Sequence, residues 1–237
     1  MDIYTFDFLF LFAFTYLLDL LSIFIHPFIC APHLRYNSVS ESERWFFIHI
    51  INNIFVIYTT YNELVICTHN IYTCDTIDMM DITKRALTMA KVTHLYHLAF
   101  FKKISYETLL HHIVMCIICG PIVYLFNNTS ISASLMFFLS GLPGFLDYIN
   151  LYLVKLGYIS PKSQKLMYLF ISLCIRCPGI LFFSILQLLY NNGQTTLQYV
   201  MKDFLAIASI WNSQYFMYLT IKDCIQKNVL VKKNSNI

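Results

Sequence analysis

The sequence predicts an all-α, multi-pass transmembrane helix bundle of about seven helices (six to eight). Hydrophobic residues make up 58% of the 237 residues and charged residues only 12%, whereas soluble domains carry about 25% charged residues. Since a helix needs roughly 20 residues to cross a bilayer, this length holds about six to eight spans and little else. The net charge of +3 is scattered along the chain, which excludes a nucleic-acid surface.

Apolar runs broken by polar clusters set the expected spans along the chain. The first run begins just after Asp2 and lacks the basic segment and cleavage site of a secretory signal, so we expect a retained first helix. The second and third runs are the most polar, because they contain Asn52, Asn53 and Lys91, which must face other helices or a cavity. The expected spans are 4–30, 45–61, 86–101, 107–126, 131–154, 166–190 and 199–221.

These spans divide the chain into three parts. We expect a first transmembrane helix and a cytosolic loop over 1–44, one membrane domain over 45–222, and a polar cytosolic tail over 223–237. Several cysteines lie in or beside apolar runs, where a thiol is usually a small buried hydrophobe, so the sequence implies no disulfide framework. These cysteines are Cys30, Cys67, Cys116, Cys119, Cys174 and Cys177.

Lysine and arginine in short loops predict the orientation, because they accumulate on the cytosolic side. Loops 127–130 and 191–198 carry no positive charge, whereas the C-terminal tail and the alternate loops are basic. Loop 62–85 is mixed in charge. We therefore expect the N-terminus outside the cytosol and the C-terminus inside it. The basic residues on the predicted cytosolic side are Arg35, Arg44, Lys102, Lys103, Lys155, Lys162, Lys165, Lys222, Lys227, Lys232 and Lys233.

Loop 127–130 contains two overlapping Asn-x-Ser/Thr sequons, at Asn127 and Asn128. The charge pattern places this loop on the lumenal side, where sequons are modified. Asn127 and Asn128 are therefore candidate glycosylation sites, although so short a loop lies close to the membrane.

Side chains that are costly in a membrane fall at one predicted depth. With about 1.5 Å of rise per residue, the pair His111 and His112 and the carboxylate of Asp147 lie roughly 10 Å from the cytosolic ends of their spans. Histidines of the third span, three residues apart, share one helix face at that depth. The predicted polar layer consists of His94, His97, His111, His112, Asp147, Arg176 and Asn212.

Each member of this layer has a structural and a functional interpretation. A charged residue at a helix centre costs roughly 2.5–3.5 kcal/mol on insertion scales, so it pairs, lines a cavity or takes part in chemistry. Asp147 and Arg176 could form an ion pair between two helices. His111 and His112 could hydrogen-bond to neighbouring helices, or transfer protons, since histidine titrates nearest neutral pH.

Histidine and aspartate are also zinc and iron ligands. The repeated HxxHH boxes of membrane di-iron oxygenases are missing from this sequence. The pairs Cys116/Cys119 and Cys174/Cys177 lie within apolar runs, where core packing is the simpler explanation. We therefore expect no metal and no resident cofactor.

Two prolines, each followed by glycine, interrupt the fifth and sixth spans at 143–144 and 178–179. Proline removes a helical hydrogen bond, and the freed carbonyl must find another partner within the membrane. We expect these interruptions to widen a cavity.

Several segments resemble the core of the TLC domain family, which includes ceramide synthases and the translocating-chain-associated membrane proteins. Residues 96–101 and 105–114 carry the paired histidines, the most specific element of the likeness. Residues 138–148 resemble the next helix of the family, and Ile175-Arg176-Cys177-Pro178 resembles the Arg-containing helix that follows. The likeness covers about residues 45–222 and implies a membrane helix bundle.

In ceramide synthases the paired histidines are followed by a helix with a His-Asp and a further Asp, which are needed for acyl transfer from acyl-CoA to a sphingoid amine. Here His111 and His112 match, but Asp147 is the sole carboxylate of the following span. The chain is more similar to the non-synthase branch. That resemblance implies binding, sensing or redistribution of membrane lipids, sphingolipids among them, in the endoplasmic reticulum or a related endomembrane.

The leading hypothesis is therefore a TLC-like protein of lipid homeostasis. The alternative is an acyl-CoA-dependent N-acyltransferase of ceramide synthase type, with acyl-CoA as co-substrate. In it, His111 or His112 takes a proton from the nucleophile and Asp147 orients the imidazole. A third alternative is a transporter or channel, which the absence of a visible inverted repeat disfavours.

Overall fold

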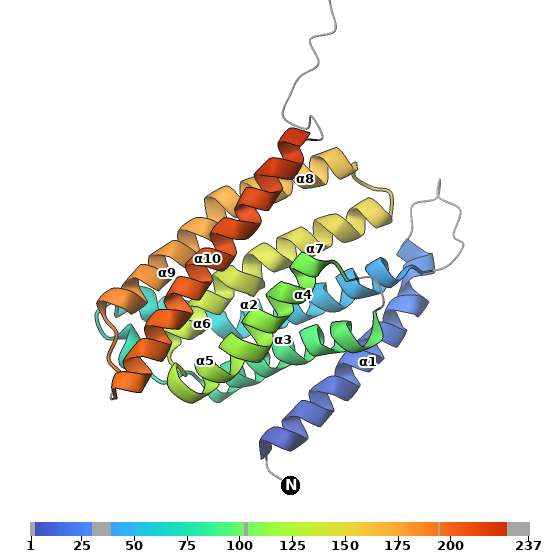
Figure 1. Cartoon of the computed structure of the whole chain (residues 1–237). Coiled ribbons are helices and arrows are strands. Elements are labelled where there is room, and N and C mark those ends of the chain that lie inside the picture. Colours follow the sequence, from blue (N-terminus) through green and yellow to red (C-terminus); the bar gives the residue numbers. More distant parts are fainter. Residues whose placement is uncertain (1–2, 30–38, 102–103, 194, 227–237) are drawn as a thin grey trace, which may run out of the picture.

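The computed structural model describes residues 3–29, 39–101, 104–193 and 195–226, and these ranges form a bundle of helices without a strand. Seven helical rods run through the described part of the chain in alternating directions (Figure 1). The predicted all-α bundle is confirmed. The rods are α1 (Ile3–Ile29), α2 (Glu41–His69), α3 (Asp81–Phe100), α4 to α5 (Tyr106–Phe126), α6 to α7 (Ser130–Lys155), α8 to α9 (Pro161–Leu189) and α10 (Thr196–Gln226).

Five of these rods are long and apolar enough to cross a membrane, so the chain is a multi-pass membrane protein. The remaining rods, α3 and α10, were expected as spans 86–101 and 199–221; α10 contains its expected range, and α3 contains all but the last residue of its range. Polar residues such as Lys91 in α3 and Asn212 in α10 lower their mean hydropathy. Much of that polarity faces the interior of the bundle, as described below.

Serine residues begin three rods at the same end of the bundle. The side chain of Ser40 accepts a hydrogen bond from the backbone N–H of Glu43, whose carboxylate in turn accepts from the N–H of Ser40 at 2.5 Å. The side chains of Ser105 and Ser160 likewise accept from the backbone N–H of Thr108 and Ser163 at the start of α4 and of α8 (Pro161–Ile171), without the reciprocal carboxylate bond. Such caps satisfy N–H groups that a helix leaves unpaired at its start, and they fix where these rods enter the bundle.

Three rods widen from α-helical to π-helical geometry near their middle, at Ile113–Cys119, Phe137–Gly141 and Ser172–Arg176. A proline follows each widened turn within two residues: Pro121, Pro143 and Pro178. Because proline has no N–H and its ring collides with the carbonyl of the preceding turn, a wider turn is the local solution. The interruptions expected at 143–144 and 178–179 are therefore present as π turns.

Gly179 lies in α9 (Cys177–Leu189) directly against the aromatic ring of Phe138. A Cβ atom at Gly179 would overlap that partly buried ring, since it would lie 2.2 Å from the nearest ring carbon. We expect Gly179→Ala to lower the free energy of unfolding by about 1–3 kcal/mol, because the ring must leave its place. Gly141→Ala is the control, since its Cβ would meet no atom nearer than 3.4 Å. Unfolding by SDS titration in mixed micelles compares the two, and equal stability would refute the packing described.

A buried carboxylate fastens α1 to its neighbours. Asp19 is 1% exposed, and it accepts hydrogen bonds from Arg44 of α2, through Nε at 2.7 Å and through a second guanidinium nitrogen. The hydroxyl of Tyr96 in α3 donates to the same carboxylate at 2.8 Å. An aspartate inside an apolar helix is thus fully paired, and α1 is held against both α2 and α3.

At the opposite end of the bundle, Cys67 and Cys74 form a disulfide between the last turns of α2 and the loop that follows. The expectation that no disulfide forms is therefore wrong for this pair. The apolar run continues up to Cys67, but the helix ends at His69 and the chain turns back. That turn brings the second thiol against the first, which hydropathy alone does not reveal.

The same loop carries a buried ion pair. Asp75 accepts from the ammonium of Lys202 in α10 at 2.5 Å and from the backbone N–H of Asn192 at 2.9 Å. Both charged side chains are 2% exposed or less. Nearby, Glu63 of α2 accepts from the hydroxyl of Ser130 at 2.5 Å. These contacts join α2, α6 (Ser130–Met136) and α10 through one loop.

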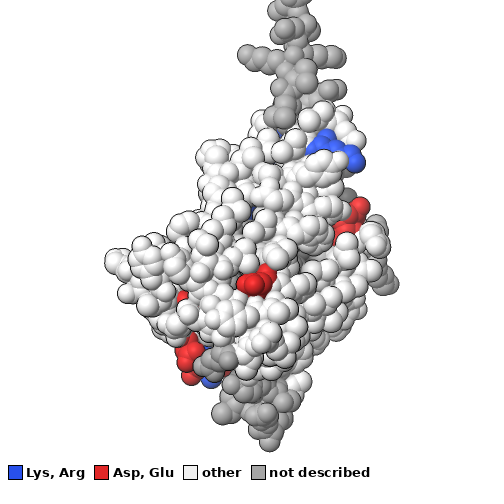
Figure 2. All heavy atoms as spheres, turned by 60° about the vertical axis from the view of Figure 1, so that its left-hand side comes forward, with Lys and Arg blue, Asp and Glu red and all other residues white. Residues whose placement is uncertain are grey.

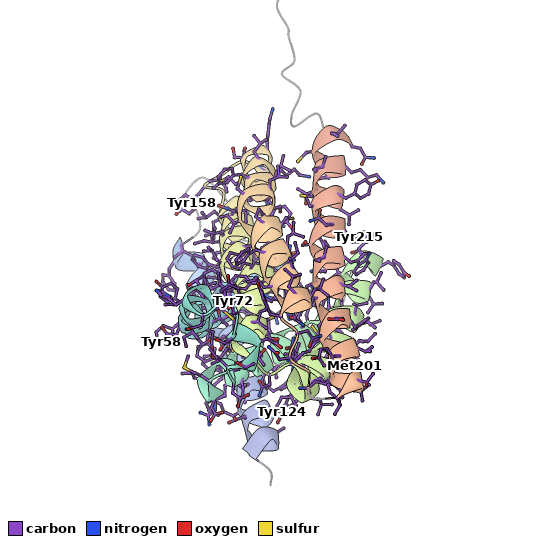
Figure 3. The ribbon with its side chains drawn as sticks, turned by 90° about the vertical axis from the view of Figure 1, so that its left-hand side faces the viewer. Tyr58, Tyr72, Tyr124, Tyr158, Met201 and Tyr215 are labelled. Carbon is purple, nitrogen blue, oxygen red and sulfur yellow. A yellow bond between two sulfur atoms is a disulfide. The ribbon has the colours of Figure 1, made fainter. Side chains whose placement is uncertain are left out.

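The outer surface is that of a lipid-facing bundle. Figure 2 shows a face on which acidic and basic side chains are few and stand apart. Large apolar side chains are exposed there and elsewhere, including Phe28 at 87% and Phe24 at 70%. Figure 3 shows the exposed Tyr158 toward one end of the bundle and Tyr124 toward the other, positions that suit the aromatic belts of membrane proteins.

Some sequence predictions fall outside the described residues. The polar tail expected at 223–237 is described only as far as Gln226, where α10 ends. The other residues concerned are Cys30, Arg35, Lys102, Lys103, Lys227, Lys232 and Lys233.

Candidate functional site

A cavity of about 410 Å³, partly open to the outside, lies among α2, α3, the rod α4 to α5, α7 (Leu142–Lys155) and α10. Its volume lies within the roughly 300–1,000 Å³ typical of ligand pockets. The structure places every member of the predicted polar layer in its wall. These are His94, His97, His111, His112, Asp147, Arg176 and Asn212.

Four histidine rings from α3 and α4 (Tyr106–His112) form a cluster at this wall. The ring of His112 is central, since its centroid lies 4.8 Å from that of His94 and 5.3 Å from that of His97. His111 follows at 5.6 Å. Sequence spacing placed each pair on its own helix, and the antiparallel packing of α3 and α4 brings the two pairs together.

Hydrogen bonds indicate which ring nitrogen carries hydrogen in three of these four histidines. Nδ1–H of His94 donates to the carbonyl oxygen of Ala90 at 2.6 Å, and Nδ1–H of His112 donates to that of Thr108 at 2.6 Å. A carbonyl oxygen can only accept, so Nε2 of each neutral ring keeps its lone pair. The side-chain oxygen of Asn212 accepts from Nδ1 of His111 at 3.0 Å, which gives that ring the same tautomer.

Three aromatic residues extend the cluster and were not singled out from the sequence. Trp45 of α2 packs against His97 with ring centroids 3.6 Å apart and the ring planes tilted by 32°. His49, one turn further along α2, stacks on Tyr148 at 4.2 Å. The sequence did contain a signal for His49. It lies four residues before Asn53, and this helical spacing places two polar side chains on one face of an apolar span.

The two charged members of the layer are not partners of each other. Asp147 accepts from the side-chain amide of Gln164 at 3.0 Å, and Arg176 donates to the hydroxyl of Tyr168 at 3.3 Å. Neither residue takes part in an ion pair within the described part of the chain. The interhelical ion pair is therefore excluded as their explanation in this structure. Nor does Asp147 orient a histidine, since Asn212 holds that place beside His111.

Several buried polar atoms in the cavity wall have no hydrogen-bond partner among the described residues. They come from several helices and π turns and include both donors and acceptors. Buried polar groups are nearly always hydrogen-bonded, so a group of unpaired ones marks a place where water or a further polar molecule can bind. Two of these atoms, Asn127 Nδ2 and Ser132 Oγ, lie farther along the cavity wall. The others form a group at the histidine end: His49 Nε2, Asn53 Nδ2, His97 Nδ1, His112 Nε2, Arg176 Nε and Asn212 Nδ2.

The cavity continues from this polar end into an apolar region. From His111 to Val123, both in the cavity wall, the rod advances roughly 18 Å at 1.5 Å per residue. The wall of this second region is mostly aliphatic side chains and sulfur. Its residues include Leu87, Ala90, Met115, Cys119, Val123, Leu135, Met136, Leu139 and Leu205. The cavity is therefore polar at one end and apolar along its length.

The candidate glycosylation sites lie where the apolar region ends. Asn127 lines the cavity and is 1% exposed, and its side-chain oxygen accepts from the hydroxyl of Thr129 at 3.2 Å. A glycan on Asn127 would have to displace these contacts, so burial disfavours it. Asn128 is partly exposed, and its backbone carbonyl accepts from the N–H of Met79 at 3.0 Å.

A metal site would need at least three ligand side chains around one point. In the part of the chain that the structure describes, no three His, Cys, Asp or Glu side chains are arranged to hold one metal ion. The cysteines of the two Cys-x-x-Cys pairs, at 116/119 and 174/177, are all free thiols.

Comparisons of the chain with protein-family models, with curated proteins and with solved structures find no match. Function is therefore argued from the cavity.

Proposed function

We propose that this membrane protein holds a lipid in its cavity and acts in lipid homeostasis, as its resemblance to the non-synthase branch of the TLC family implies. The observation that carries the proposal is the group of unpaired polar atoms at one end of the cavity. A ligand with a polar end and an apolar body would satisfy those atoms and fill the aliphatic region. Membrane lipids have this form.

The size and setting of the cavity support a lipid over a water-soluble ligand. About 410 Å³ is room for part of a lipid, such as one chain and its polar attachment. The surrounding bundle is apolar on its outside, so a ligand enters most easily from the bilayer itself.

The disulfide supports the endoplasmic reticulum or a related endomembrane as the location, with a lumenal N-terminus and a cytosolic C-terminus. Cys67 and Cys74 lie in or beside loop 62–85, which the predicted orientation places in the lumen. Disulfides form and persist in oxidising compartments and are rare in the cytosol. A disulfide in the lumen and basic loops in the cytosol fit the same orientation of the chain.

Blocking the cavity tests lipid binding. Ser209 of α10 lines the cavity and is 5% exposed, whereas Ile207 of the same helix is 58% exposed and faces outward. We expect Ser209→Trp to lower at least several-fold the amount of lipid that co-purifies and is identified by mass spectrometry. Ile207→Trp adds the same ring on the outer face and should retain the lipid of the wild type. Equal retention by both variants would contradict the proposal.

A second candidate function, an acyl-CoA-dependent acyltransferase, is favoured by the histidine tautomers. An Nε2 lone pair of His111 or His112 could take the proton of an amine or hydroxyl that attacks the thioester carbonyl of acyl-CoA. The C–S bond then breaks, and the coenzyme leaves as its thiol or thiolate. The test is turnover of long-chain acyl-CoA with sphingoid or glycerol acceptors by wild type and by His111→Ala/His112→Ala. Product that depends on the histidines would establish this candidate.

A further inference from the structure

We infer that Lys91 binds the anionic group of the cavity's ligand, so that the ligand is an amphiphile bearing a carboxylate or a phosphate. This inference rests on the proposed function and narrows it to one class of lipid. It begins from a half-buried charge in α3 that no acidic side chain of the described residues pairs with.

Lys91 lies in α3, one helical turn before His94, and lines the same cavity. Its ammonium lies 5.7 Å from the centroid of the Tyr124 ring. Within the described residues it forms no ion pair. A lysine in a membrane helix is costly, and such residues normally pair or mark the path of a substrate.

The fold leaves room for this side chain. Gly120 lies opposite Lys91, and a Cβ atom there would come within 3.0 Å of the lysine Cε and 3.3 Å of its Cδ. A glycine at this position of α5 (Gly120–Phe126) therefore lets the lysine stem lie along the neighbouring rod. The lysine is therefore half-buried against α5 and lines the cavity.

The charges around the cavity do not balance. With neutral histidine rings, the charged residues in its wall are Lys91, Arg176 and Asp147. Two cations thus face one carboxylate, which already accepts from Gln164. Nε of Arg176 is also unpaired. One anionic group on the ligand would restore neutrality and give the ammonium a charge-assisted hydrogen bond.

The position of Lys91 fits the shape of an amphiphile. The histidine cluster lies on one side of it along α3, and Ala90 and Leu87 lie on the other, where the wall becomes aliphatic. An anionic group bound at Lys91 would thus stand at the junction of the polar and apolar regions. The chain would extend past Val123 and Leu205.

Equilibrium binding of radiolabelled ligands measures this preference directly. Purified protein in detergent is titrated with radiolabelled stearic acid and with radiolabelled stearyl alcohol in a scintillation proximity assay. Lysophosphatidate and inorganic phosphate serve as competitors, to separate an anionic lipid from a free anion.

We expect the acid to bind at least about tenfold more tightly than the alcohol, as a charge-assisted hydrogen bond implies. Lys91→Met should remove that difference and Lys91→Arg should preserve it. Lys84→Met, in the exposed pair with Asp81 on the same helix, is the matched control and should bind as the wild type. Lysophosphatidate should compete and inorganic phosphate should not.

Four results would overturn the inference, and they are distinguishable. Acid and alcohol of equal affinity, or a Lys91→Met variant that still prefers the acid, would refute the role of Lys91 and leave lipid binding intact. Competition by inorganic phosphate alone would assign the site to a free anion. Binding of neither amphiphile would refute the proposed lipid cavity as well.

Discussion

Asp75→Ala is expected to destabilise the bundle by about 3–5 kcal/mol, the usual result of removing one partner of a buried ion pair. Its carboxylate and the ammonium of Lys202 are each 2% exposed or less. Without the carboxylate, the ammonium remains buried with no opposite charge, and the backbone N–H of Asn192 loses its acceptor. The loop that follows α2 would then lose its charged contact with α10.

SDS titration of purified protein in mixed micelles measures this change, with Asp81→Ala as control. Asp81 also pairs with a lysine, Lys84, but its side chain is 92% exposed, so the control should unfold as the wild type. If Asp75→Ala were as stable as Asp81→Ala, the ion pair would not hold α10 in place.

The second large effect concerns the disulfide. Replacing Cys67 and Cys74 together by serine is expected to cost about 2–3 kcal/mol, because the bond closes a short loop and restricts the unfolded chain. The effect should be close to that of a reductant on the wild type. The loop that carries Asp75 begins at this bond, so its contacts with α10 should weaken too.

Thermal unfolding with and without reductant measures the effect, and Cys174→Ser is the control, because Cys174 is an exposed free thiol. Labelling of membranes from cells with a thiol reagent adds a second readout. Cys67 and Cys74 should react only after reduction. Reaction of both thiols without reductant would show that the bond does not form in the cell, and would remove the support that it gives to a lumenal loop.

Much of the fold could be predicted from hydropathy. The spans expected at 107–126 and 131–154 correspond to the rods Tyr106–Phe126 and Ser130–Lys155. The expected span and the observed helix differ most for α2. It was expected over 45–61, but it begins before residue 45 and continues well past residue 61 to His69. Polar residues such as Glu63 end an apolar run, yet a helix continues when such a side chain is buried and bonded, as Glu63 is to Ser130.

The depth of the polar layer could also be predicted, since rise per residue fixes it. Helix rotation could not, because it depends on packing between rods. Asp147 and Arg176 show that depth alone does not predict which side chains pair. Their depth suggested an ion pair, but the side chains take other partners, Gln164 and Tyr168. The bonds between distant parts of the chain, such as Asp75 with Lys202, follow from tertiary contact and carry no local signal.

Asp19 and Lys91 had a signal in the sequence. Each is a charge within an apolar run, and the insertion cost that drew attention to Asp147 applies equally to them. Asp19 turns out to be paired with Arg44, which explains it structurally. Lys91 has no ion-pair partner among the described residues, and it carries the inference on the ligand.

Photocrosslinking tests most directly whether a lipid occupies the cavity. One helical segment, residues 113–119, presents Met115, Cys116 and Cys119 to the cavity and Ile117 and Ile118 to the outside, with exposures of 51% and 43% for the two isoleucines. Purified protein is irradiated with stearic acid carrying a diazirine in its chain, and the adducts are mapped by mass spectrometry. Adducts on the inward residues that excess stearate prevents are the predicted result. Adducts confined to Ile117, Ile118 and other outward positions would contradict the account, because the probe would then touch only the surface.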